Sequence, residues 1–228
     1  MASVWMQLAI FRNNQVYLLY PIQRVKSMSL RSLQALCLTS FFIADVRDGL
    51  GPFLGIFLTQ HHWRPDDIGL LMTAGGVAGL LATLPAGFIT DASRNKRLML
   101  AILCIMITGT TLLLWFSQGS SVVAISQIVS GICAAFIGPL ITGITLGLTG
   151  QDGFSTQMGK NEAFNHAGNF TTAVIAGGIA WRWGIGGIFI LMASTMLLTL
   201  LALAAIRRND IDNDRARGLE TTNSPRIP

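Results

Sequence analysis

An apolar run from about residue 33 to residue 58 carries three ionisable side chains near its middle, Asp45, Arg47 and Asp48. The run is long enough to cross a bilayer, because a spanning helix needs roughly 20 mostly apolar residues. Each charge at mid-membrane depth costs on the order of 2.5–3.5 kcal/mol. A helix that served only as an anchor would not be expected to carry three. The run therefore predicts a membrane helix with a function beyond anchoring.

Composition extends the membrane interpretation to the whole chain of 228 residues. Only 12% of the residues are charged, whereas soluble domains carry roughly 25%. The charges gather in short islands between long apolar runs, which is typical of a helical protein that crosses the bilayer several times. We predict an all-α membrane protein with six transmembrane helices, at about residues 32–59, 68–90, 98–116, 122–148, 161–181 and 184–206.

The predicted helices divide the chain into three parts. Residues 1–30 form an N-terminal cytoplasmic arm; the alternative is a mis-assigned start, since the segment that Met28 opens also reads well as a start. Residues 31–206 form the six-helix transmembrane domain, in which residues 151–160 are a polar loop. Residues 207–228 are polar, and they form either a disordered cytoplasmic tail or the start of a central linker.

Lys and Arg residues are distributed unequally between the two sides of the predicted bundle. The side with the termini holds most of them, whereas the opposite side holds only Arg64 and Arg182. Positively charged loops stay in the cytoplasm. We therefore expect a multi-pass protein of the plasma membrane, which in a bacterium is the inner membrane. Both termini are expected on the cytoplasmic side. This topology in a lipid bilayer accounts for the formal net charge of +5, and no nucleic-acid partner is expected.

The first three and the last three predicted helices repeat one theme: a polar helix, a helix rich in small residues, and an apolar helix. Gly51 and Pro52 in the first helix match Gly138 and Pro139 in the fourth, and both pairs are predicted to break their helix. Copies offset by three helices cross the membrane in opposite directions, so we predict a 3+3 inverted repeat. Interrupted helices at matching positions of such repeats point to a transporter binding site, although a match this short also arises by chance.

Polar side chains on three of the predicted helices are candidate site residues. Asp45 and Asp48 are three residues apart and share one helix face, and the long Arg47 side chain can neutralise a neighbouring carboxylate. Intramembrane ionisable groups point to a substrate, ion or proton site. The alternative is an internal salt bridge that holds the bundle together. The remaining candidates lie on the fourth and fifth helices and are Gln127, Asn165, His166 and Asn169.

The polar face of the fifth predicted helix has two interpretations. His166 can titrate near neutral pH and relay protons, which favours a role in transport. The same face, with Asn165 and Asn169, can instead form hydrogen bonds that pack the helix at the centre of the bundle. The sequence leaves both interpretations open.

The sequence contains no pattern typical of catalysis or metal binding. The three cysteines have no pairing or metal-type spacing, and the adjacent His61 and His62 have no clear further ligands near them. No Ser/His or paired-carboxylate arrangement has a recognisable catalytic spacing. We therefore expect a protein that is not an enzyme and that holds no metal and no cofactor.

The charged turn between the second and third predicted helices, residues 87–97, resembles a known signature. In major facilitator superfamily (MFS) transporters the corresponding turn reads Gly-x-Leu-Ala-Asp-Arg-x-Gly-Arg-Lys-Arg. The positions that match are Gly87, Asp91, Lys96 and Arg97, and those that depart are Ala92, Arg94 and Asn95. The resemblance implies that the matching residues form a gate that bridges to helices of the other half of the transporter.

The resemblance extends over about residues 31–206 and implies more about the whole protein. The family has two six-helix halves, so the chain resembles the N-terminal half, an MFS half-bundle that needs a second half or pairs as a homodimer. Gln127 stands where the family has an arginine, which removes the usual proton-coupling group. The implied function is secondary active transport of a small-molecule or ion substrate. The alternative is a truncated, non-transporting membrane protein or an interaction partner.

Overall fold

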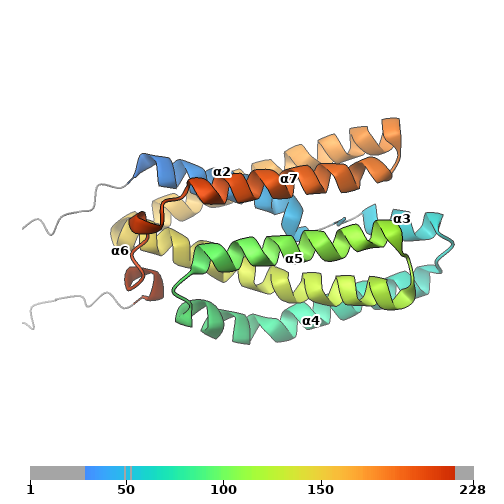
Figure 1. The fold of residues 1–228 in the computed structure, drawn as a ribbon, viewed down its shortest axis with the longest axis horizontal. Helices are drawn as coiled ribbons and strands as arrows, with labels where there is room; N and C mark the ends of the chain where they lie inside the picture. The colour runs from blue at the N-terminus through green and yellow to red at the C-terminus, as the bar shows by residue number, and fades with distance from the viewer. Residues whose placement is uncertain (1–28, 49, 52, 219–228) are drawn as a thin grey trace, which may run out of the picture.

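Helices form all of the regular secondary structure in the described residues, as predicted (Figure 1). The computed structural model describes residues 29–48, 50–51 and 53–218, so most of the predicted N-terminal arm, Gly49, Pro52 and residues 219–228 lie outside it. The helices are α2 (Leu30–Asp48), α3 (Phe53–Gln60), α4 (Pro65–Ala92), α5 (Lys96–Phe116), α6 (Ser120–Trp183) and α7 (Gly186–Ala205), followed by the 3-10 helices η1 (Arg208–Asp210) and η2 (Arg215–Arg217).

The longest helix, α6, consists of two segments joined at Gly150. Gly150 has φ +66° and ψ −174°, a conformation open to glycine because it has no Cβ. Residues 120–149 run toward the end of the molecule that holds both ends of the described chain, and residues 151–183 run back (Figure 1). The loop predicted at residues 151–160 is wrong, because these residues are helical. Their polar side chains do not break the helix, since Gln157 finds hydrogen-bond partners inside the bundle.

The first predicted helix is interrupted just after its charged residues. α2 ends at Asp48 and α3 begins at Phe53, with Leu50 and Gly51 in a turn between them. Gly51 has φ +46°, and its carbonyl accepts a hydrogen bond from the Leu54 N–H with an N···O distance of 3.3 Å. The predicted break at Pro52 falls outside the described residues.

The break predicted at Gly138 and Pro139 does not occur in the structure. α6 continues through both residues, and its non-helical position is Gly150 instead. A proline removes one backbone donor, but membrane helices tolerate this where neighbouring helices and local adjustment satisfy the freed groups. Gly51 therefore lies in a turn, whereas Gly138 lies inside a helix, although the two Gly-Pro sequences are alike.

Four of the described helices are long and apolar enough to cross a membrane, namely α4, α5, α6 and α7. Large apolar side chains cover their outer faces; Leu84, Phe88 and Ile190 are 77%, 77% and 71% exposed. Apolar surface of this extent marks contact with lipid or with a partner. The helix α2 is not one of the four, because its charged residues lower its hydropathy, and α3 has only 8 residues.

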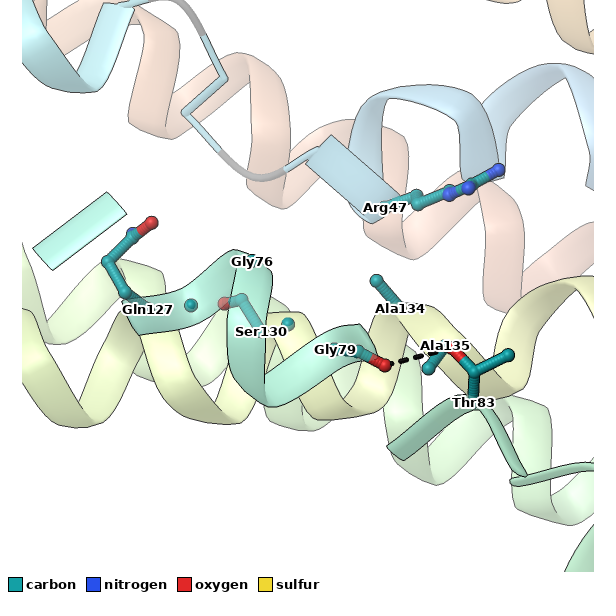
Figure 2. A pocket seen from close by; sticks show the side chains of 10 residues that line it. Arg47, Gly76, Gly79, Thr83, Gln127, Ser130, Ala134 and Ala135 are labelled. Carbon is teal, nitrogen blue, oxygen red and sulfur yellow. Dashed lines mark hydrogen bonds between the residues drawn. The ribbon is translucent and has the colours of Figure 1, made fainter. Parts of the chain in front are cut away.

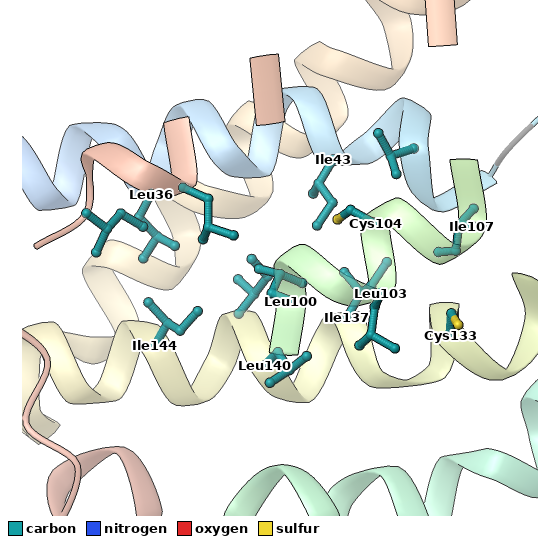
Figure 3. Close-up of a cluster of buried hydrophobic side chains, with 14 of the residues drawn as sticks. Leu36, Ile43, Leu100, Leu103, Cys104, Ile107, Cys133, Ile137, Leu140 and Ile144 are labelled. Atoms are coloured by element: carbon teal, nitrogen blue, oxygen red, sulfur yellow. The ribbon is translucent and has the colours of Figure 1, made fainter. Parts of the chain in front are cut away.

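Two clusters of buried apolar side chains join the helices. The larger cluster connects α2, α5, α6 and α7 and includes Leu36, Leu100, Leu140 and Ile144 (Figure 3). The smaller cluster includes Leu58 of α3, Leu114 of α5 and Phe189 of α7. Lipid tails are as apolar as leucine, so close packing stabilises such clusters more than transfer out of lipid does.

Residues 207–218 pack against the ends of the helices. The Ser32 hydroxyl donates to Asp210 Oδ2 at 2.6 Å, and the Asp212 N–H donates to the Gly147 carbonyl at 2.9 Å. Ala216 is buried. Residues 207–218 are therefore in contact with α2 and α6.

Candidate functional site

An open pocket of about 460 Å³ lies between α2, α4 and α6. Its volume is in the range of small-molecule sites, roughly 300–1,000 Å³. We call it the Arg47 pocket. The residues that line it are Arg47, Gly75, Gly76, Gly79, Thr83, Gln127, Ser130, Gly131, Ala134 and Ala135 (Figure 2).

Glycines allow α4 and α6 to approach closely at one wall of the Arg47 pocket. A Cβ built on Gly131 would lie 2.0 Å from the Gly75 carbonyl oxygen, so no side chain fits there. Close backbone approach through small residues is a common way for membrane helices to pack. Gly76 differs, because a Cβ built on it meets nothing within 4 Å. Gly131 thus serves helix packing, whereas Gly76 leaves open space.

Four polar side chains line the Arg47 pocket. Arg47 lies in the last turn of α2, is exposed, and stands across from the α6 residues (Figure 2). Gln127 and Ser130 lie three residues apart on α6, and residues at this spacing share a helix face. The Ser130 hydroxyl oxygen is buried and has no hydrogen-bond partner in the described part of the chain. The Thr83 hydroxyl donates to the Gly79 carbonyl at 3.0 Å. The structure therefore brings Arg47 and Gln127, both predicted site residues, to one pocket.

Of the two predicted carboxylates, Asp45 is not part of the lining of the Arg47 pocket. Asp45 is half-buried, and its Oδ2 accepts a hydrogen bond from the Thr195 hydroxyl of α7 at 2.5 Å. The Asp48 side chain lies outside the described part of the structure. Asp45 thus contacts α7, and it does so from the helix that also carries Arg47.

The predicted residues of the fifth helix lie in the second segment of α6, away from the Arg47 pocket. The Asn165 amide donates to the Ser40 carbonyl of α2 at 3.2 Å, whereas His166 and Asn169 are exposed. None of the three lines the pocket. Asn165 therefore matches the packing interpretation of this face, and the proton-relay role of His166 stays a prediction.

A second group of polar side chains is buried where α2 meets the two segments of α6. The Gln157 amide donates to Asn161 Oδ1 at 2.9 Å, and the Asn161 amide donates to the Thr145 hydroxyl at 2.9 Å. Cys37 of α2 lies 3.2 Å from Gln157 Nε2 and 3.6 Å from Asn161 Oδ1. We call these four side chains the Asn161 network. They satisfy one another, as buried polar groups must if the fold is to be stable.

The predicted gate residues lie at the turn between α4 and α5. Asp91 is exposed, and Gly87 is half-buried on α4. The buried Lys96 ammonium donates to the Thr90 carbonyl at 2.5 Å and to the Ser93 carbonyl at 3.1 Å. The Arg97 guanidinium donates to the Ile206 carbonyl beyond α7. The two cations thus bind backbone carbonyls, and the one carboxylate faces outward.

The adjacent histidines lie at the opposite end of the bundle. His61 and His62 are exposed, and His61 Nδ1 lies 2.8 Å from the Phe57 carbonyl oxygen. Within the described ranges, no group of three or more His, Cys, Asp or Glu side chains is arranged to hold a metal ion.

Several residues of these sites are not among the sequence candidates, and three of them have polar side chains with different sequence signals. Ser130 follows Gln127 by three residues, a spacing that indicates a shared face. Gln157 stands four residues before Asn161, but it falls in the stretch predicted to be a loop. Thr195 lies in an apolar helix, and no sequence signal connects it with Asp45.

Comparisons with known proteins agree on one family. The model of the Major Facilitator Superfamily matches residues 36–228. Two proteins of Mycobacterium tuberculosis strains, each named an uncharacterized MFS-type transporter, are 36% identical to the chain over 191 residues, which is 83% of this chain and 46% of each relative. An uncharacterized MFS-type transporter of Schizosaccharomyces pombe is 23% identical over 140 residues, 60% of this chain and 31% of that protein.

The matched region of the chain spans less than half the length of each of these relatives. No solved structure matches it significantly.

Proposed function

The chain belongs to the Major Facilitator Superfamily, whose members are transporters and not enzymes, and we propose that it moves a small solute across the membrane by secondary active transport. The chain is a multi-pass membrane protein. The names of its relatives give no substrate, so the solute has to be inferred from the residues of this chain.

The observation that carries the proposal is the Arg47 pocket. Arg47 and Gln127 both line one open space between α2, α4 and α6. Intramembrane ionisable residues beside a cavity mark substrate and ion pathways. The break between α2 and α3, next to Arg47, also supports a role in transport, because transporter sites form at broken helices.

The bundle that we propose has six spans. α2 with α3 is the first, α4 and α5 are the second and third, the two segments of α6 are the fourth and fifth, and α7 is the sixth. A 3+3 inverted repeat of these spans makes an N-terminal half-bundle, and the length of the relatives supports this, since they are about twice as long as the matched region. The Arg47 pocket is open on one side. A second six-helix bundle, from the rest of a longer protein or from a second copy, would close it.

We propose that the protein lies in the plasma membrane of a bacterium, that is, its inner membrane. Both termini then lie on the cytoplasmic side. Both ends of the described chain and the α4–α5 turn lie at the same end of the bundle (Figure 1). That end carries most of the basic residues, including Lys96 and Arg97, whereas Arg64 and Arg182 lie near the other end. The bias follows the positive-inside rule. Asp91, exposed at this end, is available to bridge to a second bundle as a gate.

Uptake into proteoliposomes tests the transport proposal. The chain is extracted gently, with any partner that accompanies it, and reconstituted. Uptake is then measured for four solute classes: organic anions, organic cations, amino acids and sugars. We expect uptake of at least one class and a loss of about fivefold or more in the Gln127→Leu variant, because that amide faces the pocket. The matched control is Gln60→Leu, which changes an exposed glutamine at the end of α3 and leaves uptake unchanged.

Absence of uptake by correctly inserted protein, for all four classes, would contradict transport and favour a truncated or interacting membrane protein. Native mass spectrometry of the extracted complex tests the second bundle separately. We expect the mass of two copies or of a complex with another six-helix chain, and a stable monomer would contradict that part of the proposal.

A further inference from the structure

We propose that the Arg47 pocket binds the negatively charged group of a small organic anion, a carboxylate or a phosphate ester, with Arg47 as its counter-ion. This inference rests on the proposed function, since it names the substrate class of the same pocket. It is carried by the charge, the hydrogen-bonding groups and the free space of the residues that line the pocket.

The charge of the pocket lining is positive. Arg47 is the only ionisable residue among the described residues that line it. A charged arginine in a membrane-spanning region is expensive unless it is paired or solvated. Arg47 is exposed and lines the open pocket, and no salt bridge in the described ranges includes it. An anion in the pocket would pair with this charge.

The uncharged groups of the pocket add donors to this charge. The Gln127 side chain has an NH₂ group, and the Ser130 hydroxyl has no partner among the described residues, so both have hydrogens to donate. Thr83 already donates its hydrogen to Gly79. Guanidinium, amide and hydroxyl donors around one space suit an oxyanion, because arginine binds carboxylate and phosphate through two parallel hydrogen bonds.

The space in the pocket suits a small solute. Gly76 has nothing within 4 Å of a built Cβ, and Ala134 and Ala135 present only methyl groups. The volume of about 460 Å³ fits an organic acid of modest size better than an inorganic ion alone. The occupant is therefore expected to carry a carbon skeleton beside its anionic group.

The carboxylates of α2 allow a competing inference, a cation site. Asp45 does not support it, because its Oδ2 accepts a hydrogen bond from Thr195 on α7 and the residue is not part of the pocket lining. Asp48 follows Arg47 directly, and its side chain lies outside the described structure. The experiment therefore includes an Asp48 variant.

Ligand-dependent thermal stability measures binding directly. The full chain, in lipid nanodiscs with any partner that accompanies it, is heated with increasing succinate, glycerol 3-phosphate, choline or glucose. The variants are Arg47→Gln, Arg47→Lys and Asp48→Asn. The control is Arg31→Gln, which removes the same charge from an exposed position of α2, about 24 Å away at 1.5 Å per residue.

We expect saturable stabilisation by at least one of the two anions and none by choline or glucose. Arg47→Gln should weaken the affinity at least tenfold, Arg47→Lys should restore part of it, and Arg31→Gln and Asp48→Asn should keep it. Comparison of succinate with glycerol 3-phosphate identifies the carboxylate or the phosphate as the preferred group.

Three results would overturn the inference. The first is stabilisation by choline or glucose alone, and the second is anion binding that survives Arg47→Gln. The third is no binding of any probe, which is the result expected if an acidic residue of a second bundle forms a salt bridge with Arg47. The proteoliposome assay keeps the two proposals apart. Uptake restricted to cations or neutral solutes refutes the anion site and leaves transport standing, whereas anion binding without uptake refutes transport and leaves the anion site standing.

Discussion

The Asn161 network and the Arg47 pocket both lie between α2 and α6 and contain polar side chains, yet these side chains differ in whether they have hydrogen-bond partners. In the Asn161 network each amide finds a partner, with Gln157 donating to Asn161 and Asn161 donating to Thr145. In the Arg47 pocket the Ser130 hydroxyl has no partner among the described residues and Arg47 faces open space. Paired polar groups stabilise a bundle. Unpaired ones reduce its stability and are expected where a ligand binds.

The comparison teaches how to separate packing from function in a membrane helix. Both regions look alike in sequence, as isolated polar residues in apolar surroundings. Substitutions should nevertheless divide them cleanly, with stability affected in the Asn161 network and ligand binding affected in the Arg47 pocket. The glycine wall behind the pocket is the exception, because it belongs to packing.

The largest effect is expected from Gly131→Ala at this wall. The added Cβ would lie 2.0 Å from the Gly75 carbonyl oxygen, so α4 and α6 must move apart, at a cost of about 3 kcal/mol. The unfolding free energy in detergent, from denaturant titration followed by circular dichroism, measures this loss. The matched control is Gly76→Ala, where the new methyl group meets nothing within 4 Å. Equal stability of the two variants would contradict the close approach of α4 and α6.

A smaller loss of stability is expected from Asn161→Leu. Asn161 is 1% exposed, and its removal leaves the Gln157 amide without its best acceptor, which costs about 2 kcal/mol. The folded variant should keep its affinity for anions, because Asn161 does not line the Arg47 pocket. The same denaturant titration and the nanodisc assay measure both quantities. Lost affinity with unchanged stability would reverse the roles assigned to the two regions.

The smallest effect is expected from Ser130→Ala. Its hydroxyl has no partner within the described part of the chain, so the unfolding free energy should stay the same or rise slightly. The affinity for an anion should fall about threefold, the size of one lost hydrogen bond of roughly 0.6 kcal/mol. Titration of the variant with the preferred anion measures the change. A loss of stability comparable with that of Asn161→Leu would mean that Ser130 has a structural partner.

The sequence alone was enough to predict most of the fold. Apolar runs and charge islands indicated helices at nearly all the observed positions, because membrane-spanning length and lipid exposure leave a direct pattern in composition. The gate turn, with Gly87 and Asp91, indicated the family that the comparisons then showed. The prediction of a loop at residues 151–160 was wrong, since these residues are helical. Gln157 is buried in the bundle, whereas Gln151, Asp152 and Lys160 are exposed.

The candidate site was predicted less completely. Arg47 and Gln127 were both named from the sequence, but so were His166 and Asn169, which are exposed and do not line the pocket. A polar residue in an apolar helix indicates that its side chain needs a hydrogen-bond partner or a ligand. The sequence does not show which face of the helix is covered by neighbouring helices. Residues that bind a ligand and residues that pack the bundle therefore look the same in the sequence.

What the sequence by itself determined is the helical membrane class, the uneven distribution of basic residues and the family signature, because each depends on local composition or on spacing along the chain. Only the tertiary structure decided which polar groups meet. It turned Asp45 toward Thr195, placed Asn161 in a satisfied network and left Arg47, Gln127 and Ser130 around an open pocket. The physical reason is that such pairings depend on the reversal at Gly150 and on the close approach of α4 and α6 at Gly131, which are contacts between segments far apart in the chain.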